Sequence, residues 1–108
     1  MSKARKWGLP PSVVQIVRAM CIDYDRRNVA IKFGTVPADV LQSYQQTNAI
    51  IDAALELVEV GIRRDMLNDI ILDRGYHYSP ISYLFAKNTY YARKRQIVYK
   101  IAKTLKLI

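Results

Sequence analysis

The sequence predicts a small all-α domain of four or five helices with a C-terminal helix-turn-helix. Two observations lead to this fold class. Hydrophobic residues make up 51% of the 108 residues, which is enough for one modest core, and they recur along much of the chain at spacings of three and four. Four glycines and four prolines leave little material for a loop-rich or all-β design.

The chain length leaves room for one domain over 1–108 and not for two. We expect residues 1–9 to form a flexible basic arm. Residues 10–60 are expected to form a helical spine, and residues 62–108 a helix-turn-helix unit. No internal repeat or low-complexity tract divides the chain further.

The first helix is predicted over 12–32. Ser12 follows two prolines and is the expected cap, because its hydroxyl can accept from the first unpaired amides. Apolar residues at helical spacing then continue to Gly34, which lies just past the end. The polar run 23–28 is the place where this helix would bend or break.

The second helix is predicted to start at Pro37 and to stop at Gly61. Its apolar side chains alternate at spacings of four and three, namely Val40, Tyr44, Thr47, Ile51, Ala54 and Val58. Such a seam suits a core helix of one domain, and it equally suits a homodimer through the 38–60 helix. Both interpretations stay open at the level of sequence.

The third helix is predicted over 62–74, with Asp65, Asp69 and Asp73 along one side. We expect this row to be a solvated face balanced by arginines rather than a cation site, so no metal is predicted. Ser79 and the proline after it then predict a short helix over 79–84. A tight connection would lead into the last helix.

The arrangement of charge narrows the classes of partner that this protein could bind. The net charge is +8, and all nine acidic residues lie between Asp23 and Asp73. From Arg74 to Ile108 there are eight lysines or arginines and no aspartate or glutamate. A terminal third of one sign attracts polyanions, which leaves nucleic acid, an anionic membrane or an acidic protein.

Several classes have no positive support in the sequence. One cysteine (Cys21) and one histidine (His77) give neither a disulfide framework nor a zinc site. Neither a secretory signal nor an apolar run long enough for a membrane helix is visible, so we expect a cytoplasmic protein without a membrane partner. No phosphate loop or nucleophile motif is present, so neither an enzyme nor a cofactor is predicted.

The last helix is predicted from Asn88, its expected cap, to Leu105. At about 100° per residue, one side holds the apolar anchor Tyr90, Ile97, Ile101 and Leu105. The opposite side holds a strip of small, polar and basic residues, namely Asn88, Ala92, Arg95, Gln96, Tyr99, Lys103 and Lys106.

This strip suits the major groove of double-stranded DNA. Asn88, Arg95 and Gln96 carry groups that bond base edges, and Ala92 allows close approach. Phosphate contacts are expected from Lys87, Arg93, Lys94, Lys100 and Lys103, with Arg93 and Lys94 reaching outward past the anchor. The predicted contacts are completed by the hydroxyls of Thr89, Tyr91 and Tyr99.

The segment 88–99 (NTYYARKRQIVY), followed by 101–105 (IAKTL), resembles the C-terminal end of small phage and prophage regulators of the RinA/ArpU late-gene activator type. The resemblance extends upstream through 67–71 and 75–76. It implies that this helix is the recognition helix of a helix-turn-helix like that of sigma-factor region 4. The link 82–87 is shorter than the usual spacing and departs from the pattern.

The expected function is therefore sequence-specific binding of double-stranded DNA by a phage or prophage transcription regulator, with recognition helix 88–105. RNA polymerase and a second copy of the chain are its expected further partners. Two alternatives remain. One is a DNA-packaging factor resembling a terminase small subunit, which would assemble into rings. The other is a helical protein-interaction module that does not bind DNA.

Overall fold

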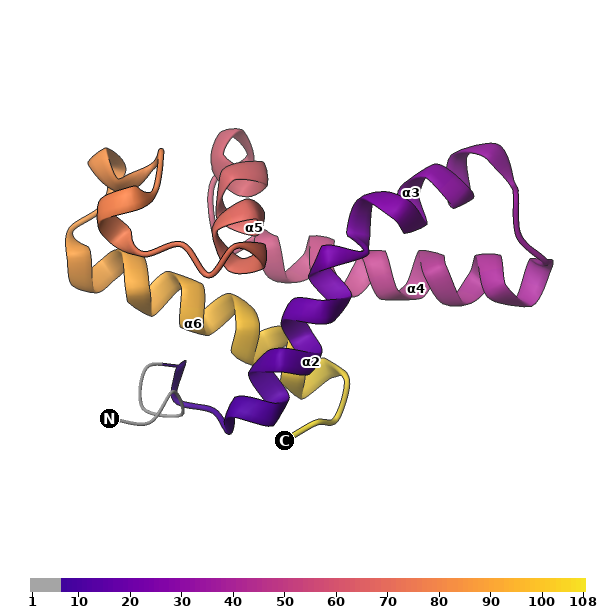
Figure 1. Ribbon diagram of the computed structural model, residues 1–108, viewed down its shortest axis with the longest axis horizontal. Coiled ribbons are helices and arrows are strands. Elements are labelled where there is room, and N and C mark those ends of the chain that lie inside the picture. Colours follow the sequence, from indigo (N-terminus) through magenta and orange to yellow (C-terminus); the bar gives the residue numbers. More distant parts are fainter. Residues whose placement is uncertain (1–6) are drawn as a thin grey trace.

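The computed structural model describes residues 7–108, which form α-helices and short 3-10 turns and contain no strand (Figure 1). The predicted all-α class is confirmed. In chain order the elements are α2 (Pro11–Ile22), α3 (Tyr24–Phe33), α4 (Ala38–Leu55), η1 (Val60–Ile62), α5 (Arg63–Ile71), η2 (Tyr76–Tyr78), η3 (Ser82–Leu84) and α6 (Lys87–Thr104).

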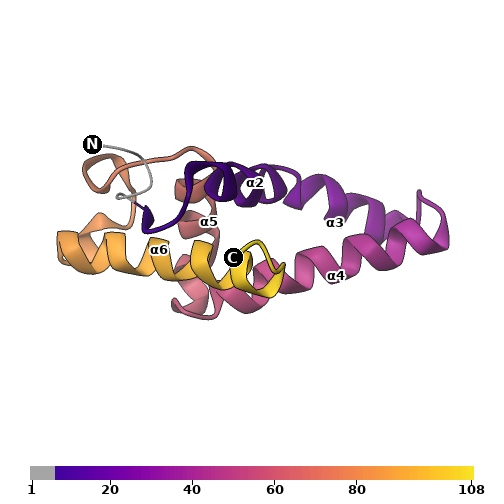
Figure 2. The ribbon, with the colours of Figure 1, turned by 90° about the horizontal axis from the view of Figure 1, so that it is seen from below.

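The helices form a bundle with a projecting hairpin, and the molecule measures 43 × 29 × 19 Å along its principal axes. Helices α2, α5 and α6 pack with the C-terminal part of α4. Figures 1 and 2 both show α3 beside the first part of α4, extending away from the other helices. The hairpin therefore has little of the molecule to pack against besides itself.

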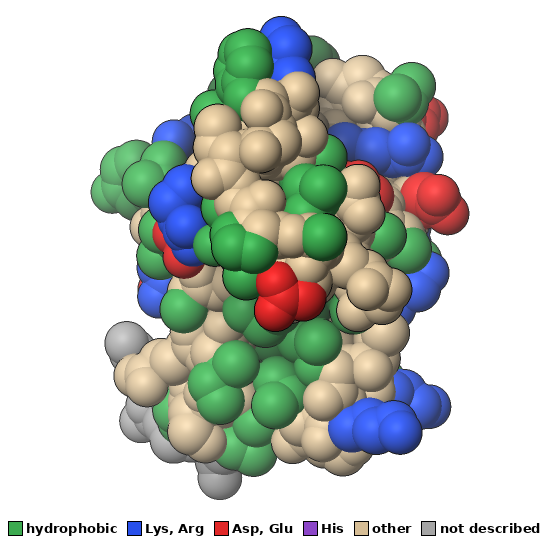
Figure 3. All heavy atoms as spheres, turned by 90° about the vertical axis from the view of Figure 1, so that its right-hand side faces the viewer, with side chains coloured by type: hydrophobic (Ala, Val, Ile, Leu, Met, Phe, Trp, Pro, Cys, Tyr) green, Lys and Arg blue, Asp and Glu red, His purple; other side chains and the backbone are tan. Residues whose placement is uncertain are grey.

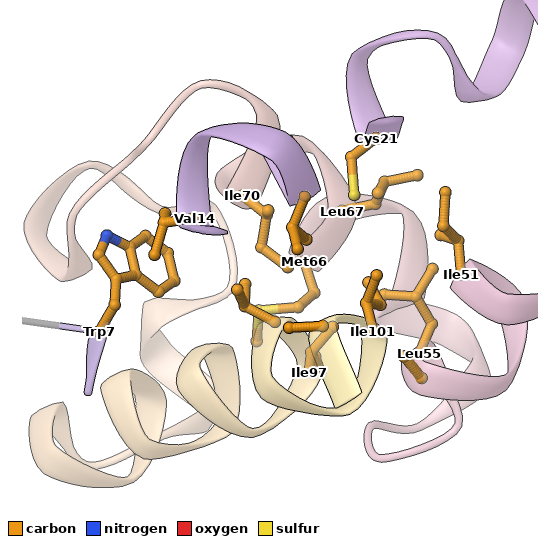
Figure 4. Close-up of a cluster of buried hydrophobic side chains, with 14 of the residues drawn as sticks. Trp7, Val14, Cys21, Ile51, Leu55, Met66, Leu67, Ile70, Ile97 and Ile101 are labelled. Atoms are coloured by element: carbon orange, nitrogen blue, oxygen red, sulfur yellow. The ribbon is translucent and has the colours of Figure 1, made fainter. Parts of the chain in front are cut away.

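The core lies where α2, α4, α5 and α6 meet. Figure 4 shows Ile97 and Ile101 of α6 facing Met66 of α5, with Ile51 of α4 and Cys21 of α2 closing the cluster. These five side chains are 0–1% exposed. Burying a side chain of this size contributes about 1.5–3 kcal/mol, so this one cluster holds most of the fold together.

The first predicted helix is two helices. Asp23, at φ −86° and ψ 3°, separates α2 from α3 and turns the chain between them. The polar run that begins there is thus a break. Gly34 ends α3 in the left-handed region at φ 60°, as predicted. Ser12 makes no cap bond, because Pro10 holds the N-cap position of α2.

The seam on the second predicted helix is used inside the molecule over its C-terminal half. Ile51 and Ala54 are fully buried and Val58 nearly so, which confirms a core helix there. The helix ends earlier than predicted, at Leu55 and not at Gly61, because the chain turns through residues 56–59 into η1. The homodimer through the 38–60 helix stays a prediction.

The start of the chain differs from the predicted arm. Residues 1–6 lie outside the described part of the chain. Trp7 and Leu9 belong to the core and are almost fully buried, so the arm does not extend to residue 9. Their large apolar side chains gain more from burial than a solvated arm could offer.

The connection between α5 and α6 also differs from the prediction. No α-helix forms over 79–84, where the chain contains only the 3-10 turn η3, and residues 72–86 between α5 and α6 contain η2 and η3. The predicted tight link into the last helix is present, because only residues 85 and 86 separate η3 from α6. Ser79 Oγ donates to Asp69 and accepts from the N–H of Ile81. Asp73, at φ 50°, turns the chain just after α5, which ends at Ile71 rather than at residue 74.

Candidate nucleic-acid interface

Helix α6 has two opposite faces, as its spacing predicts. Tyr90, Ile97 and Ile101 are buried, and Leu105 packs partly buried against the same core. The anchor predicted from the sequence is therefore confirmed. Because the anchor fixes the rotation of α6 about its axis, it also decides which side chains reach solvent.

The first turn of α6 is exposed. The helix begins at Lys87, with Ala86 at the N-cap position and no side-chain cap bond, so Asn88 is not the cap that was predicted. Lys87, Asn88 and Thr89 are all exposed. The side chain of Asn88 thus lies on the surface at the start of the strip rather than folded back on the backbone.

We call the side of α6 opposite the anchor the outer strip. Ala92 and Arg95 are half-buried within it, and Tyr99 is 47% exposed. The remaining members on α6 are exposed, namely Asn88, Gln96 and Lys103, and Lys106 is exposed just past the end of α6, at φ 58°. An open hollow of 330 Å³ beside the strip is lined by Trp7, Gly8, Ala92, Arg95, Gln96 and Tyr99.

Lys94 corrects one predicted contact. Its side chain lies on the anchor side and is only 1% exposed, so it cannot reach a phosphate. Nζ donates to the carbonyl of Arg74 at 2.7 Å and lies 5.2 Å from the ring centroid of Trp7 and 5.4 Å from that of Tyr90. Aromatic faces and a carbonyl replace the water that the ammonium loses.

Three further predicted contacts are turned toward the domain. The hydroxyl of Tyr91 accepts from the backbone N–H of Tyr76 at 3.0 Å and holds η2 against α6. The ammonium of Lys100 donates to the carbonyl of Ala53 at 3.2 Å, where a cation suits the negative end of the α4 dipole. Arg93 is half-buried and lines a different hollow, beside Leu57, Val58, Glu59, Ile62, Leu84 and Phe85, while one guanidinium nitrogen donates to Oε1 of Gln96 at 3.1 Å.

A buried carboxylate, missed at the level of sequence, locks the start of α6 in place. Asp69 is 0% exposed, so the row of aspartates is not simply a solvated face. Its Oδ2 accepts from Ser79 Oγ at 2.5 Å and from the hydroxyl of Tyr90 at 2.9 Å. Its Oδ1 lies 3.3 Å from a guanidinium nitrogen of Arg74. Burial, together with the hydrogen bond to this carboxylate, raises the pKa of Tyr90, which stays protonated as a donor.

Comparison with known proteins adds no assignment. No family model matches the chain, and neither a curated protein nor a solved structure is similar to it. Within residues 7–108, no group of three or more potential ligands is placed to hold a metal ion. None of the helices formed by these residues has the length and hydrophobicity to cross a membrane.

Proposed function

We propose that this protein binds double-stranded DNA, with the outer strip of α6 in the major groove. The observation that carries the proposal is the pairing of exposure with charge on one helix face. The strip leaves Lys103 and Lys106 in solvent, and the chain has no acidic residue after Asp73. A helix about 10–12 Å across with such a face fits the groove.

The strip divides into residues that read bases and residues that hold the backbone. Ala92 is the smallest side chain on it, so α6 can approach the groove floor there, with Arg95 and Gln96 beside it. Arginine pairs with guanine, and asparagine or glutamine with adenine, through two hydrogen bonds each. Lys87 and Lys103, at the two ends of the helix, would neutralise phosphates on either side of the groove.

The role that fits such binding is transcription regulation by a phage or prophage protein. It rests on the resemblance of the 88–105 segment to RinA/ArpU-type activators, which also suggests RNA polymerase as a further partner. Sequence-specific sites usually contain two half-sites, so we include a homodimer in the proposal. A ring-forming packaging factor would bind DNA as well, and oligomeric size separates the two roles.

A mobility-shift titration tests the proposal. The probe is first a random-sequence pool of short duplexes and then the duplex that selection enriches from that pool. We expect Lys103→Ala to weaken binding to every duplex alike, because it removes a phosphate contact. Arg95→Ala should weaken the selected duplex by about tenfold to a hundredfold, equivalent to about 1–3 kcal/mol, and relax its sequence preference.

The matched control is Lys100→Ala, which removes a lysine of the same helix that is not part of the outer strip and donates to the carbonyl of Ala53. It should bind nearly as the wild type does. If Arg95→Ala and Lys103→Ala bind as tightly as Lys100→Ala, the assignment of the outer strip is wrong. If the wild type binds neither the pool nor any duplex selected from it, the DNA-binding function itself is wrong.

A further inference from the structure

The α3–α4 hairpin is built with its polar side inward. Between the two helices, Arg27 Nε donates to Asn48 Oδ1 at 2.7 Å, and Asn48 Nδ2 donates to Asn28 Oδ1 at 2.7 Å. The hydroxyl of Tyr24 donates to a carboxylate oxygen of Asp52. Hydrogen bonds, and not apolar packing, therefore make up much of the contact between α3 and α4.

Three exposed apolar side chains lie on the other side of α3 and at the end of α2. Ile22, at the end of α2, is 57% exposed, Val29 is 56% exposed and Phe33 is 65% exposed. Figure 3 views the molecule from the end that carries this hairpin, and hydrophobic side chains reach the surface there among charged ones. An apolar side chain gains from burial, so this face is energetically incomplete in a single copy.

These side chains form a regular stripe. With Arg26 they are spaced by four, three and four residues, which is the spacing of a two-helix seam. We call Ile22, Arg26, Val29 and Phe33 the outer stripe. At about 100° per residue, Arg26, Val29 and Phe33 lie opposite the side of α3 that holds Tyr24 and Arg27, and Ile22 precedes them across the turn at Asp23. No part of residues 7–108 covers it, as the exposed fractions show.

Arg26 does not place its charge in the middle of the stripe. One guanidinium nitrogen donates to the hydroxyl of Tyr44 at 3.2 Å and another to Asp23 at 3.0 Å. The guanidinium carbon lies 5.5 Å from the ring centroid of Tyr44. The charge is thus drawn toward α4, and what Arg26 can offer the stripe is its aliphatic stem.

We propose that the outer stripe is an interface between two copies of this chain, paired antiparallel about a two-fold axis. Such an axis near the middle of α3 places Ile22 of one copy against Phe33 of the second, and Arg26 against Val29. The spacing of four, three and four residues is the same in both chain directions, as an antiparallel interface with two-fold symmetry requires. This dimer uses α3, and not the seam of α4 that the core already occupies.

Charge decides between the antiparallel and the parallel pairing. Asp25 and Lys32 lie on the same flank of the stripe, seven residues apart. In the antiparallel pair, Asp25 of one copy lies within a turn of Lys32 of the other. In a parallel pair the same flanks lie at opposite edges of the interface, so Asp25 and Lys32 of the two copies would not meet. The carboxylate of Asp25 pairs with Arg64 at 2.5 Å and keeps 62% of its side chain exposed, so a second cation can approach it.

The contact between the two copies is small, so we expect a weak dimer. The stripe spans three turns of helix, roughly 17 Å at 1.5 Å per residue, which is less than the usual extent of a stable interface. We therefore expect a dimer that dissociates on dilution. It forms without DNA, so its test bears on the homodimer included in the proposed function but not on DNA binding by α6.

Sedimentation velocity over a dilution series tests the dimer. The wild type should shift from dimer to monomer on dilution, and Val29→Glu should raise the dimer dissociation constant by tenfold or more, about 1.4 kcal/mol. Val60→Glu is the matched control, because Val60 is 78% exposed and lies in η1, away from the stripe. A wild type that is monomeric throughout, or a Val29→Glu variant that dimerises like Val60→Glu, overturns the proposal.

Disulfide trapping tests the pairing direction. A copy with Arg26→Cys should link to a differently tagged copy with Val29→Cys, because the two positions oppose each other across the axis. Cys21 does not interfere, since it is fully buried and burial raises the pKa of its thiol to about 12. If Val29→Cys copies link only to one another, and the mixed pair does not form, the antiparallel pairing is wrong.

Discussion

Replacing Asp69 with alanine tests how α6 is held in place. Asp69 accepts hydrogen bonds from Ser79 and Tyr90 and pairs with Arg74, all from a fully buried position. The substitution leaves the hydroxyl of Ser79 without this acceptor. Tyr90 keeps a second acceptor, the carbonyl of Arg74 at 3.1 Å. The segment 72–86 would then lose its main polar tie to α5.

The magnitude follows from these contacts. Removing one partner of a buried charged pair costs about 3–5 kcal/mol, because the remaining group stays buried. The retained bond of Tyr90 and the partial exposure of Arg74 place our expectation near the lower end, about 3 kcal/mol. Small domains are stable by only about 5–15 kcal/mol, so this loss is a large part of the total.

Urea unfolding followed by circular dichroism measures this loss. The matched control is Asp65→Ala, one turn earlier on α5, where we expect a loss below about 1 kcal/mol from the helix dipole. Asp69→Asn keeps one acceptor oxygen and should fall between the two. The reasoning fails if Asp69→Ala unfolds at the same urea concentration, and with the same slope, as Asp65→Ala.

Three further predictions follow from buried or paired groups. Lys94→Met should lower the free energy of unfolding by about 1–3 kcal/mol, because the carbonyl of Arg74 loses a donor, yet leave the salt dependence of DNA binding unchanged; urea unfolding and a salt titration check the two halves. Cys21, whose pKa is raised to about 12, should react with a thiol reagent at pH 8 only as fast as the protein unfolds, and rapid labelling of the native protein would contradict this. Hydrogen bonds from Arg64 hold the pKa of Asp25 below its ordinary value, so this pair stabilises the fold above about pH 4, and the effect is lost as pH falls through the lowered pKa. In an acid titration of stability, the wild type should therefore lose a small amount of stability that the Asp25→Asn variant does not lose. Equal curves for the two proteins would argue against the pair.

The parts of the fold that follow a simple period could be predicted from the sequence. Tyr90, Ile97 and Ile101 recur at helical spacing, and their burial fixes the two faces of α6 as expected. The left-handed glycine after α3 was equally visible, because Gly34 stands where an apolar period stops. Local sequence is enough in such cases, since the same residues make and end the helix.

Lys94 and Asp69 could not be placed in this way, because their burial depends on residues far away in the chain. The shell around Lys94 includes Trp7, and the acceptor role of Asp69 depends on Tyr90. Charged side chains are mostly exposed, so the residue types alone point to the surface. The one local signal was position, because Lys94 lies between Tyr90 and Ile97 on the anchor side of the helical wheel.

The short helix predicted over 79–84, between α5 and α6, is also wrong. Ser79 followed by proline is a common start for a helix, and it predicts one where none forms. The hydroxyl of Ser79 instead donates to Asp69, and the N–H of Ile81 donates to Ser79 Oγ at 3.2 Å. Ser79 thus makes the cap-type bond as well as the tertiary one, but only the 3-10 turn η3 follows it.

The most direct test of the DNA-binding proposal is the salt dependence of wild-type binding to a duplex. Besides Lys100, which donates to the carbonyl of Ala53, the exposed cations of α6 and the turn after it are Lys87, Lys103 and Lys106, with Arg95 half-buried among them. Contacts from this set predict that the logarithm of the binding constant falls linearly with the logarithm of salt concentration, with a slope of about −3 to −4. Lys103→Ala should make that slope shallower by about 1. A slope near zero, or one that Lys103→Ala leaves unchanged, would contradict the proposal that α6 meets the phosphates of DNA.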